Sequence, residues 1–326
     1  MRKRNLVALL GAASCLVAAS EPVRLQPSSK WVLDYAENSC RLIRNFGEGK
    51  HQATLVLESG GPGTLSMVAI GEDLKGRRSL ALNDSLDRAE GTATFLPARG
   101  YKLRGRLAES SGDHRPAIMW SGVYFGEVAK DDREALEKAK AAASKRERPP
   151  PRDLAKRAAG RTNSDQFAAG VTAIEIEARR GHPVVLETGS LGEPMRMFDQ
   201  CIRDEMRGWG IDPDLEEKIV RPVWPINPQQ WLSGDDYPID MLREDKESSV
   251  KVRLLVDAAG KVTRCTTLSQ VDAPEFEKVV CDAILRNGRF EPAELADGTK
   301  VPSYYTQQIM FRIAGSIARG TRLIAH

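Results

Sequence analysis

The sequence of 326 residues predicts an α+β protein, and three observations support that fold class. Short segments in which apolar and polar residues alternate recur along much of the chain, as in half-buried strands. Clusters of Gly, Pro and Asp separate these segments and are typical of turns. Two other stretches, residues 194–208 and 276–284, place apolar residues at helical spacing. We expect a mainly antiparallel β domain with one helix, followed by a small ββαβ domain.

Residues 1–20 have the parts of a secretory signal peptide: a basic start at residues 2–4, an apolar run at residues 6–20, and small residues before Glu21. The apolar run is shorter than the roughly 20 residues that a spanning helix needs. We therefore predict a secreted, periplasmic protein with no membrane span after signal cleavage. Two alternatives stay open: residues 6–20 are retained as an inner-membrane anchor with the chain facing the periplasm, or Cys15 carries a lipid.

The charge of the chain gives no sign of a nucleic-acid partner. The sequence contains 48 Lys and Arg against 45 Asp and Glu, a formal net charge of +3. Removal of the predicted signal takes away three basic residues and no acidic residue, which leaves 45 of each. A neutral mature chain lacks the basic footprint of a nucleic-acid-binding protein, so we expect recognition by specific contacts.

The N-terminal β-rich domain is expected over residues 21–216. Its predicted strands lie at residues 42–46, 53–58, 65–70, 92–96, 117–123, 172–177 and 182–187. Its predicted helix, residues 194–208, places four apolar side chains on one face: Met195, Phe198, Ile202 and Met206. Residues 130–161 are charge-dense, Ala-rich and interrupted by three prolines, so we expect a charged, flexible insertion at about these positions.

The C-terminal part begins after a proline-rich, extended segment at residues 217–236, which we predict to be the interdomain linker. The C-terminal domain then covers residues 237–314, and residues 315–326 form a tail. Apolar and polar residues alternate at residues 250–256, which predicts a half-buried strand, and Leu255 breaks the alternation in a way that indicates burial on both faces. A second strand, a helix and a last strand follow at residues 262–269, 274–287 and 304–313.

The order and spacing of these segments resemble the TonB C-terminal domain family, over residues 237–313 only. The resemblance is carried by Tyr237-Pro238, the segment 249–262, the helix at 276–281, residues 289–293 and the last strand. It implies that the module binds a protein or peptide partner, such as a segment of an outer-membrane receptor, by adding a strand to a sheet edge. The edge implied here is the last strand.

The resemblance also implies a set of partner-binding residues on this edge and at the entry to the domain. They are Tyr237, Pro238, Tyr304, Thr306, Gln308, Met310 and Arg312. For each apolar residue in this set, packing against the helix is a simpler interpretation than contact with a partner. A homodimer through the same exposed edge is a further alternative.

The function expected from these features is that of a periplasmic TonB-like protein linked to outer-membrane transport. The first alternative is a membrane-anchored energy transducer that retains residues 6–20, but the short apolar run and the lack of a long spacer before Tyr237 count against it. The second alternative is an enzyme with its site in the N-terminal domain. The sequence has no Gly-x-Ser-x-Gly and no His-Glu-x-x-His motif, so we predict no catalytic residue.

Cysteine usage agrees with export. Without Cys15 the chain has four cysteines, and an even number in an oxidising compartment predicts two disulfides. Three connectivities are possible. We favour Cys265–Cys281, which joins the second strand of the C-terminal module to its helix, and therefore Cys40–Cys201. The sequence has no Cys-x-x-Cys pair and its four histidines are scattered, so we expect no metal site and no cofactor.

Overall fold

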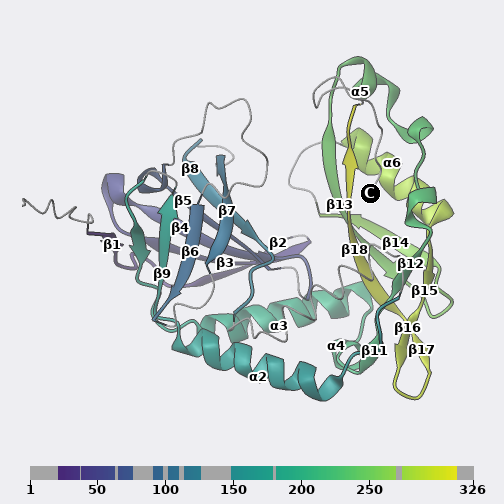
Figure 1. Cartoon of the computed structure of the whole chain (residues 1–326), viewed down its shortest axis with the longest axis horizontal. Helices are drawn as coiled ribbons and strands as arrows, with labels where there is room; N and C mark the ends of the chain where they lie inside the picture. The colour runs from purple at the N-terminus through teal and green to yellow at the C-terminus, as the bar shows by residue number, and fades with distance from the viewer. Residues whose placement is uncertain are drawn as a thin grey trace, which may run out of the picture.

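A computed structural model describes residues 21–36, 38–62, 65–75, 91–97, 102–109, 114–125, 148–178, 181–268 and 274–313. The predicted signal peptide, most of the predicted insertion and the tail lie outside these ranges. The described chain forms two parts: a large curled sheet with long helices beneath it, and a smaller group of strands around one helix (Figure 1). The predicted α+β class is confirmed.

The N-terminal sheet has ten strands and is mixed, because β1 and β10 are parallel while every other neighbouring pair is antiparallel. In spatial order the strands are β1 Val23–Leu25, β10 Val184–Leu186, β9 Ala173–Ala178, β6 Gly91–Leu96, β7 Leu103–Glu109, β8 Pro116–Ser121, β5 Ser66–Gly71, β4 Ala53–Ser59, β3 Ser39–Phe46 and β2 Val32–Ala36. Every second residue of β4 is buried, as the alternation in its sequence predicts.

Helix α3 (Gly192–Trp209) closes the core of this sheet. Phe198 on its apolar face is buried with the strand side chains, and a disulfide joins Cys201 to Cys40 of β3. The helix ends where Gly210 takes a left-handed conformation with φ 84°. The helix predicted at residues 194–208 is therefore present, extended by two residues at its start and one at its end.

The expected single helix is wrong, because a second long helix, α2 (Leu154–Gly170), packs beside α3. Residues 154–161, which we expected in the flexible insertion, form its first turns. The Asp153 carboxylate caps the helix by accepting from the backbone N–H groups of Ala155 and Lys156, at 3.0 and 3.1 Å. Ala168 is the helix's one buried residue, so the sequence has too narrow an apolar stripe to reveal it.

The C-terminal part contains a three-stranded antiparallel sheet in the order β14-β13-β18. Its elements are α5 Ile239–Arg243, β13 Ser248–Val256, β14 Val262–Thr267, α6 Pro274–Asn287, β15 Arg289–Glu291, β16 Ala293–Leu295, β17 Lys300–Val301 and β18 Ser303–Phe311. Alternate residues of β13, including the fully buried Val252 and Leu254, form one core with the apolar face of α6. The predicted ββαβ order is observed, with three short strands, β15, β16 and β17, added between α6 and β18.

The segment expected to be a linker is folded instead. After the short helix α4 (Pro213–Glu216), strands β11 (Ile219–Arg221) and β12 (Trp224–Ile226) pair with β16 and β15 of the C-terminal part. Trp231 is buried in the same core as α6. The prolines do keep this segment extended, but its backbone hydrogen bonds and its tryptophan attach it to the module.

Candidate partner-binding site

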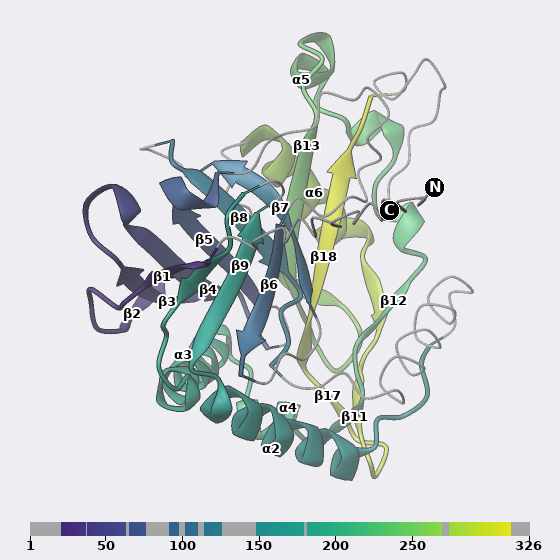
Figure 2. The ribbon, with the colours of Figure 1, turned by 60° about the vertical axis from the view of Figure 1, so that its left-hand side comes forward.

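Strand β18 is an outer strand of its sheet, beside β13 (Figure 2). The backbone carbonyl of Lys251 in β13 accepts from the N–H of Leu268 at 2.7 Å, so Lys251 directs its backbone polar groups toward the β14 side. Lys251 is paired with Gln308 of β18. Because hydrogen-bonded and non-hydrogen-bonded pairs alternate in an antiparallel ladder, the backbone groups of Gln308 point away from β13.

The same alternation applies to Tyr304, Thr306 and Met310, which lie at even spacing from Gln308 in an unbroken register. Among the described residues, no strand or loop backbone pairs with these four residues on their outer side. The edge therefore offers a row of backbone donors and acceptors of the kind that an added strand uses.

Side chains of β18 alternate between the two faces of the sheet. Ile309 and Phe311 are buried in the core with α6. On the opposite face, Met310 is 39 % exposed, and the Gln308 amide donates to the Ser249 hydroxyl at 2.6 Å. Thr306 and Arg312 share this face by alternation. The structure thus brings five of the predicted residues onto one face of the edge strand, and their role in binding stays a prediction.

The two predicted residues at the domain entry lie elsewhere. Tyr237 is 9 % exposed, with its ring against Phe276 and Phe311 and its hydroxyl donating to the carbonyl of Lys246 at 2.6 Å. Burial and nearby acidic groups raise the pKa of this hydroxyl. Pro238 precedes α5 as its N-cap. Tyr237 is a core residue because its ring completes the aromatic cluster at the end of α6, so it does not lie at the open edge.

Tyr304 faces the N-terminal domain. Its ring packs edge-on against Trp209 at the end of α3, with 5.9 Å between the centroids, and burial raises the pKa of its hydroxyl. The guanidinium carbon of Arg253 lies 3.6 Å from the centroid of the same Trp209 ring. Nη1 of Arg253 donates to the carbonyl oxygens of Asn38 and Gly60, at 3.4 and 3.1 Å. These contacts fix the face of the C-terminal sheet against the first domain.

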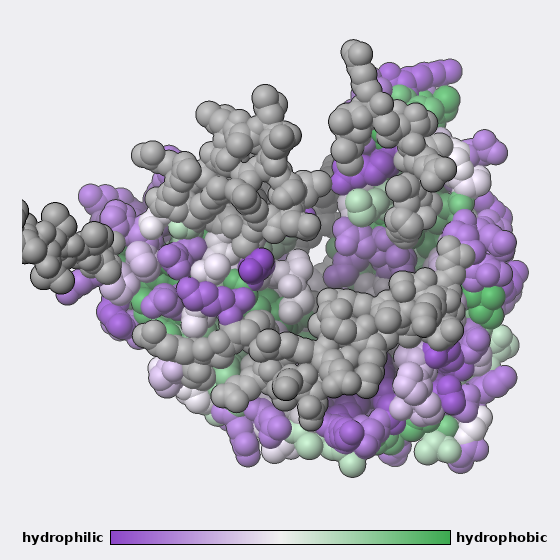
Figure 3. All heavy atoms as spheres, viewed as in Figure 1, coloured by the Kyte–Doolittle hydropathy of each residue, from purple (hydrophilic) through white to green (hydrophobic). Residues whose placement is uncertain are grey.

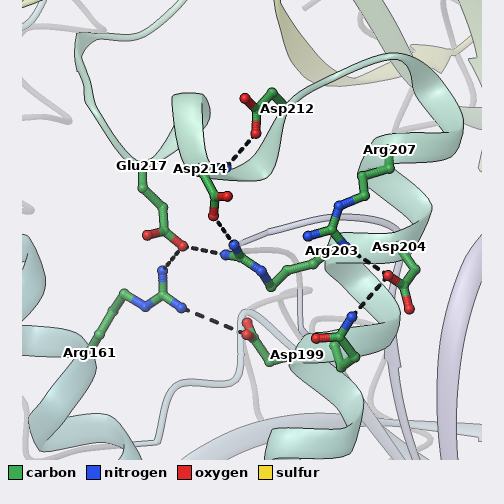
Figure 4. Close-up of polar contacts among 9 residues, drawn as sticks. Arg161, Asp199, Arg203, Asp204, Arg207, Asp212, Asp214 and Glu217 are labelled. Carbon is green, nitrogen blue, oxygen red and sulfur yellow. Dashed lines mark hydrogen bonds and ion pairs between the residues drawn. The ribbon is translucent and has the colours of Figure 1, made fainter.

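A second junction lies at the end of α4. One carboxylate oxygen of Glu217 accepts from Arg161 of α2 and from Arg203 of α3, each at 2.5 Å (Figure 4). Its neighbour Glu216 is 8 % exposed and accepts from the Ser303 hydroxyl of β18 at 2.6 Å. Consecutive residues therefore join the helices of the first domain to the edge strand of the second.

The two carboxylates have opposite pKa shifts. Burial raises the pKa of Glu216, and this outweighs its hydrogen bond from Ser303. Burial also acts to raise the pKa of Glu217, but the hydrogen bonds and positive charges of Arg161 and Arg203 outweigh it and lower the pKa.

Sequence reasoning does not find these junction residues. Arg253 lies in a strand where a polar residue at that position indicates an exposed face. Its burial depends on Trp209, which is 44 positions away in the chain and belongs to another domain. Leu255 gives the one signal, because its break in the alternation predicts burial on both faces, and it is buried with Met206 and Ile211.

Further structural findings bear on the predicted sites. Both disulfides that we favoured from the sequence are formed, Cys40–Cys201 and Cys265–Cys281. In the described ranges, no three His, Cys, Asp or Glu side chains come together as a metal site would require. None of the helices in this part of the chain has the length and apolar character needed to cross a membrane.

Comparison with known proteins supports the resemblance in one segment. Residues 234–313 match the family described as Gram-negative bacterial TonB protein C-terminal. A search of curated proteins found no match to the chain. The matched segment begins just before Tyr237 and ends two residues after β18, so it covers the three-stranded sheet and α6. Over residues 234–313, the chain therefore carries a TonB C-terminal domain.

Proposed function

We propose that this chain is a periplasmic protein whose TonB C-terminal domain binds an extended segment of an outer-membrane protein by strand addition along β18. The observation that carries the proposal is the open backbone edge of β18, within a segment that matches a family of partner-binding domains. Two disulfides support an oxidising compartment. The edge and the family match are separate observations that favour the same kind of partner.

The chemistry of the edge suggests how the partner is held. Backbone hydrogen bonds to the outer side of β18 supply affinity irrespective of the partner's side chains. Thr306, Met310 and Arg312 then contact alternate side chains of the added strand and supply selectivity. The Gln308 amide is already bonded to the Ser249 hydroxyl. Arg312 is already paired with Glu247 at 2.7 Å, so of these side chains Met310 offers the main apolar contact.

The docking of the module favours this function over force transmission. A TonB-type transducer, as the family resemblance implies, places its C-terminal domain at the end of a long spacer. Here residues 219–226 pair with the module itself, and Arg253 and Tyr304 hold it against the first domain. The module is thus attached to a folded domain at short range, as expected of a binding protein.

The experiment that tests the proposal compares Gln308→Pro with Gln308→Ala. Proline removes the outward N–H of Gln308 and leaves the β13 ladder intact, whereas alanine removes the side chain and keeps the N–H. A photo-cross-linking amino acid at Met310 reports the partner in intact cells. We expect Gln308→Ala to retain the cross-link to an outer-membrane protein, and Gln308→Pro to reduce it about tenfold, as the loss of one hydrogen bond allows.

Two outcomes would count against strand addition at this edge. One is an equal cross-link yield in both variants while circular dichroism and the unfolding transition of Gln308→Pro match those of the unmodified chain. The other is a cross-link of the chain only to itself, which would assign the edge to a homodimer.

A further inference from the structure

A cavity of about 390 Å³ lies between the two domains, on the β14 side of the C-terminal sheet and thus away from the β18 edge. Its walls come from the β2–β3 hairpin, the end of α3, and strands β13 and β14. It is lined by Tyr35, Asn38, Asp204, Glu205, Gly208, Trp209, Arg253, Leu255, Arg264 and Thr266. Its volume is in the range of small-molecule sites. Figure 3 shows a gap between the two parts of the molecule on the face viewed there.

Arg253 is the unusual group in this cavity. The residue is 3 % exposed, yet among the described residues its guanidinium forms no ion pair with a carboxylate. Nη1 of Arg253 donates to the carbonyl oxygens of Asn38 and Gly60, whereas Nε and Nη2 have no hydrogen-bond partner in the described part of the chain. Neither nitrogen is a fully buried atom without a hydrogen-bond partner, so both are reached by solvent. An acceptor that reaches these two nitrogens from the cavity would complete the hydrogen bonding of this mostly buried guanidinium.

Arg264 of β14 adds a second positive charge to the same cavity. It is exposed and, within the ranges that the structure describes, has neither an ion pair nor a hydrogen bond. Burial lowers the pKa of Arg253 to about 10, and the positive charge of Arg264 contributes to the lowering while Glu205 opposes it. An anion that enters the cavity would offset the repulsion between these two positive charges.

The acidic residues of the cavity are already engaged. Asp204 accepts from Gln200 and Arg207 at 2.9 and 2.8 Å. Glu205 accepts from the indole N–H of Trp209 at 3.2 Å. Their charges make the lining neutral overall, which disfavours a multiply charged anion such as phosphate. Trp209 and Leu255 provide apolar surface beside the free donors of Arg253.

We propose that this cavity binds an organic monocarboxylate with an apolar or aromatic body. The carboxylate accepts from Arg253 and Arg264, and the body packs on Trp209 and Leu255. The ligand is either a free small acid or the C-terminal residue of a peptide, since both present the same chemistry. This site does not depend on strand addition at β18, which uses the opposite edge of the sheet.

The test uses the full chain and the exposed arginine, because changes at Arg253 also disturb domain docking. Phenylpropionate is added to the protein and its binding is followed by tryptophan fluorescence. Phenylpropionamide serves as the neutral control, and inorganic phosphate serves as the anion without an apolar body. We expect phenylpropionate to bind more tightly than either. We expect Arg264→Gln to weaken its binding about tenfold, as loss of one charge-assisted hydrogen bond allows.

Arg243→Gln is the matched control, because it removes the same charge from α5, outside the cavity lining. It should leave the affinity unchanged, and Trp209→Phe should reduce the fluorescence signal. Comparison of the peptide Ala-Ala-Phe with its C-terminal amide then separates the sources: selective binding of the free carboxylate identifies a peptide terminus, and binding of phenylpropionate alone identifies a small acid. Absence of carboxylate binding, equal binding of the amide, stronger binding of phosphate, or an equal effect of Arg243→Gln would each overturn the proposal.

Discussion

Adjacent glutamates show how strongly position decides the behaviour of one residue type. Glu216 is enclosed by the domain junction, where its carboxylate receives the Ser303 hydroxyl. Glu217, the next residue, points to Arg161 and Arg203. The cost of burying charge dominates at Glu216, and ion pairing dominates at Glu217.

The opposite pKa shifts predict opposite pH dependence of stability. The raised pKa of Glu216 means that the folded protein holds this proton more tightly than the unfolded chain does. Its stabilising contribution therefore falls as pH rises from the ordinary value of 4.5 through the raised value. Glutamine at position 216 removes that fall. We therefore expect the difference in the free energy of unfolding, Glu216→Gln minus the unmodified chain, to increase with rising pH, which means that the variant gains stability relative to the unmodified chain.

Glu217→Gln is the matched comparison. The lowered pKa of Glu217 gives stability that is present above the ordinary value of 4.5 and is lost as pH falls through the lowered value. This variant should be less stable than the unmodified chain at neutral pH and equal to it in acid. Urea unfolding between about pH 3 and pH 8 measures both differences. The same pH trend in the two variants would contradict the assignment.

At the scale of elements, the end of α3 is the joint between the two sheets. The disulfide of Cys201 joins the helix to β3. Trp209 lies eight residues further along and contacts Arg253 of β13 and Tyr304 of β18. The left-handed Gly210 stops the helix there and lets Ile211 turn back into the apolar contact with Leu255. One helix thus connects the core of the first domain to the face of the second.

Replacement of Trp209 tests this joint. Trp209→Ala leaves a cavity beside Tyr304 and removes the aromatic face over Arg253, so we expect a loss of about 2 kcal/mol in the free energy of unfolding. Trp209→Phe keeps an aromatic ring and should lose clearly less. Denaturant unfolding with calorimetry is the measurement. If the alanine variant is as stable as the phenylalanine variant, Trp209 does not hold the domains together.

At the scale of the whole molecule, the two domains share a continuous set of contacts. The connecting segment pairs with the C-terminal strands, and Arg148 reaches across to Glu291 at 2.8 Å and to the carbonyls of Pro222 and Pro292. Within the described ranges no strand pairs with the outer side of β18, so these contacts leave that edge open. The N-terminal part therefore supports the TonB C-terminal domain, and under the proposed function it would present the edge of β18 to a partner.

The signal peptide that the sequence predicts leads to an expected mass and thiol content of the mature protein. We expect an intact mass that begins at Glu21, and no cysteine alkylation before reduction, because the remaining four cysteines form two disulfides. Reduction should make all four reactive. A mass that retains Met1 would support the anchored alternative, and a lipid-modified Cys15 would show a lipoprotein. Free thiols in the exported protein would contradict the two-disulfide assignment.

The local elements follow from the sequence alone. Alternation marks the central strands, as in β4 and β13, because one face of each meets a core. Gly260 marks the hairpin between β13 and β14, where its φ is 81° and a side chain would clash with the carbonyl of Phe290. The even number of cysteines after residue 20 indicated two disulfides, and the order of elements indicated the TonB C-terminal domain.

Tertiary structure decided how these elements contact one another. Helix α2 depends on ion pairs and a neighbouring helix, so it leaves little apolar periodicity in the sequence. Tyr237 lies in the core and not at the open edge, because its ring packs against Phe276 and Phe311, which are distant in the chain. Arg253 is buried because Trp209 covers it. Periodicity reports that a face is covered, but which element covers it follows only from the folded chain.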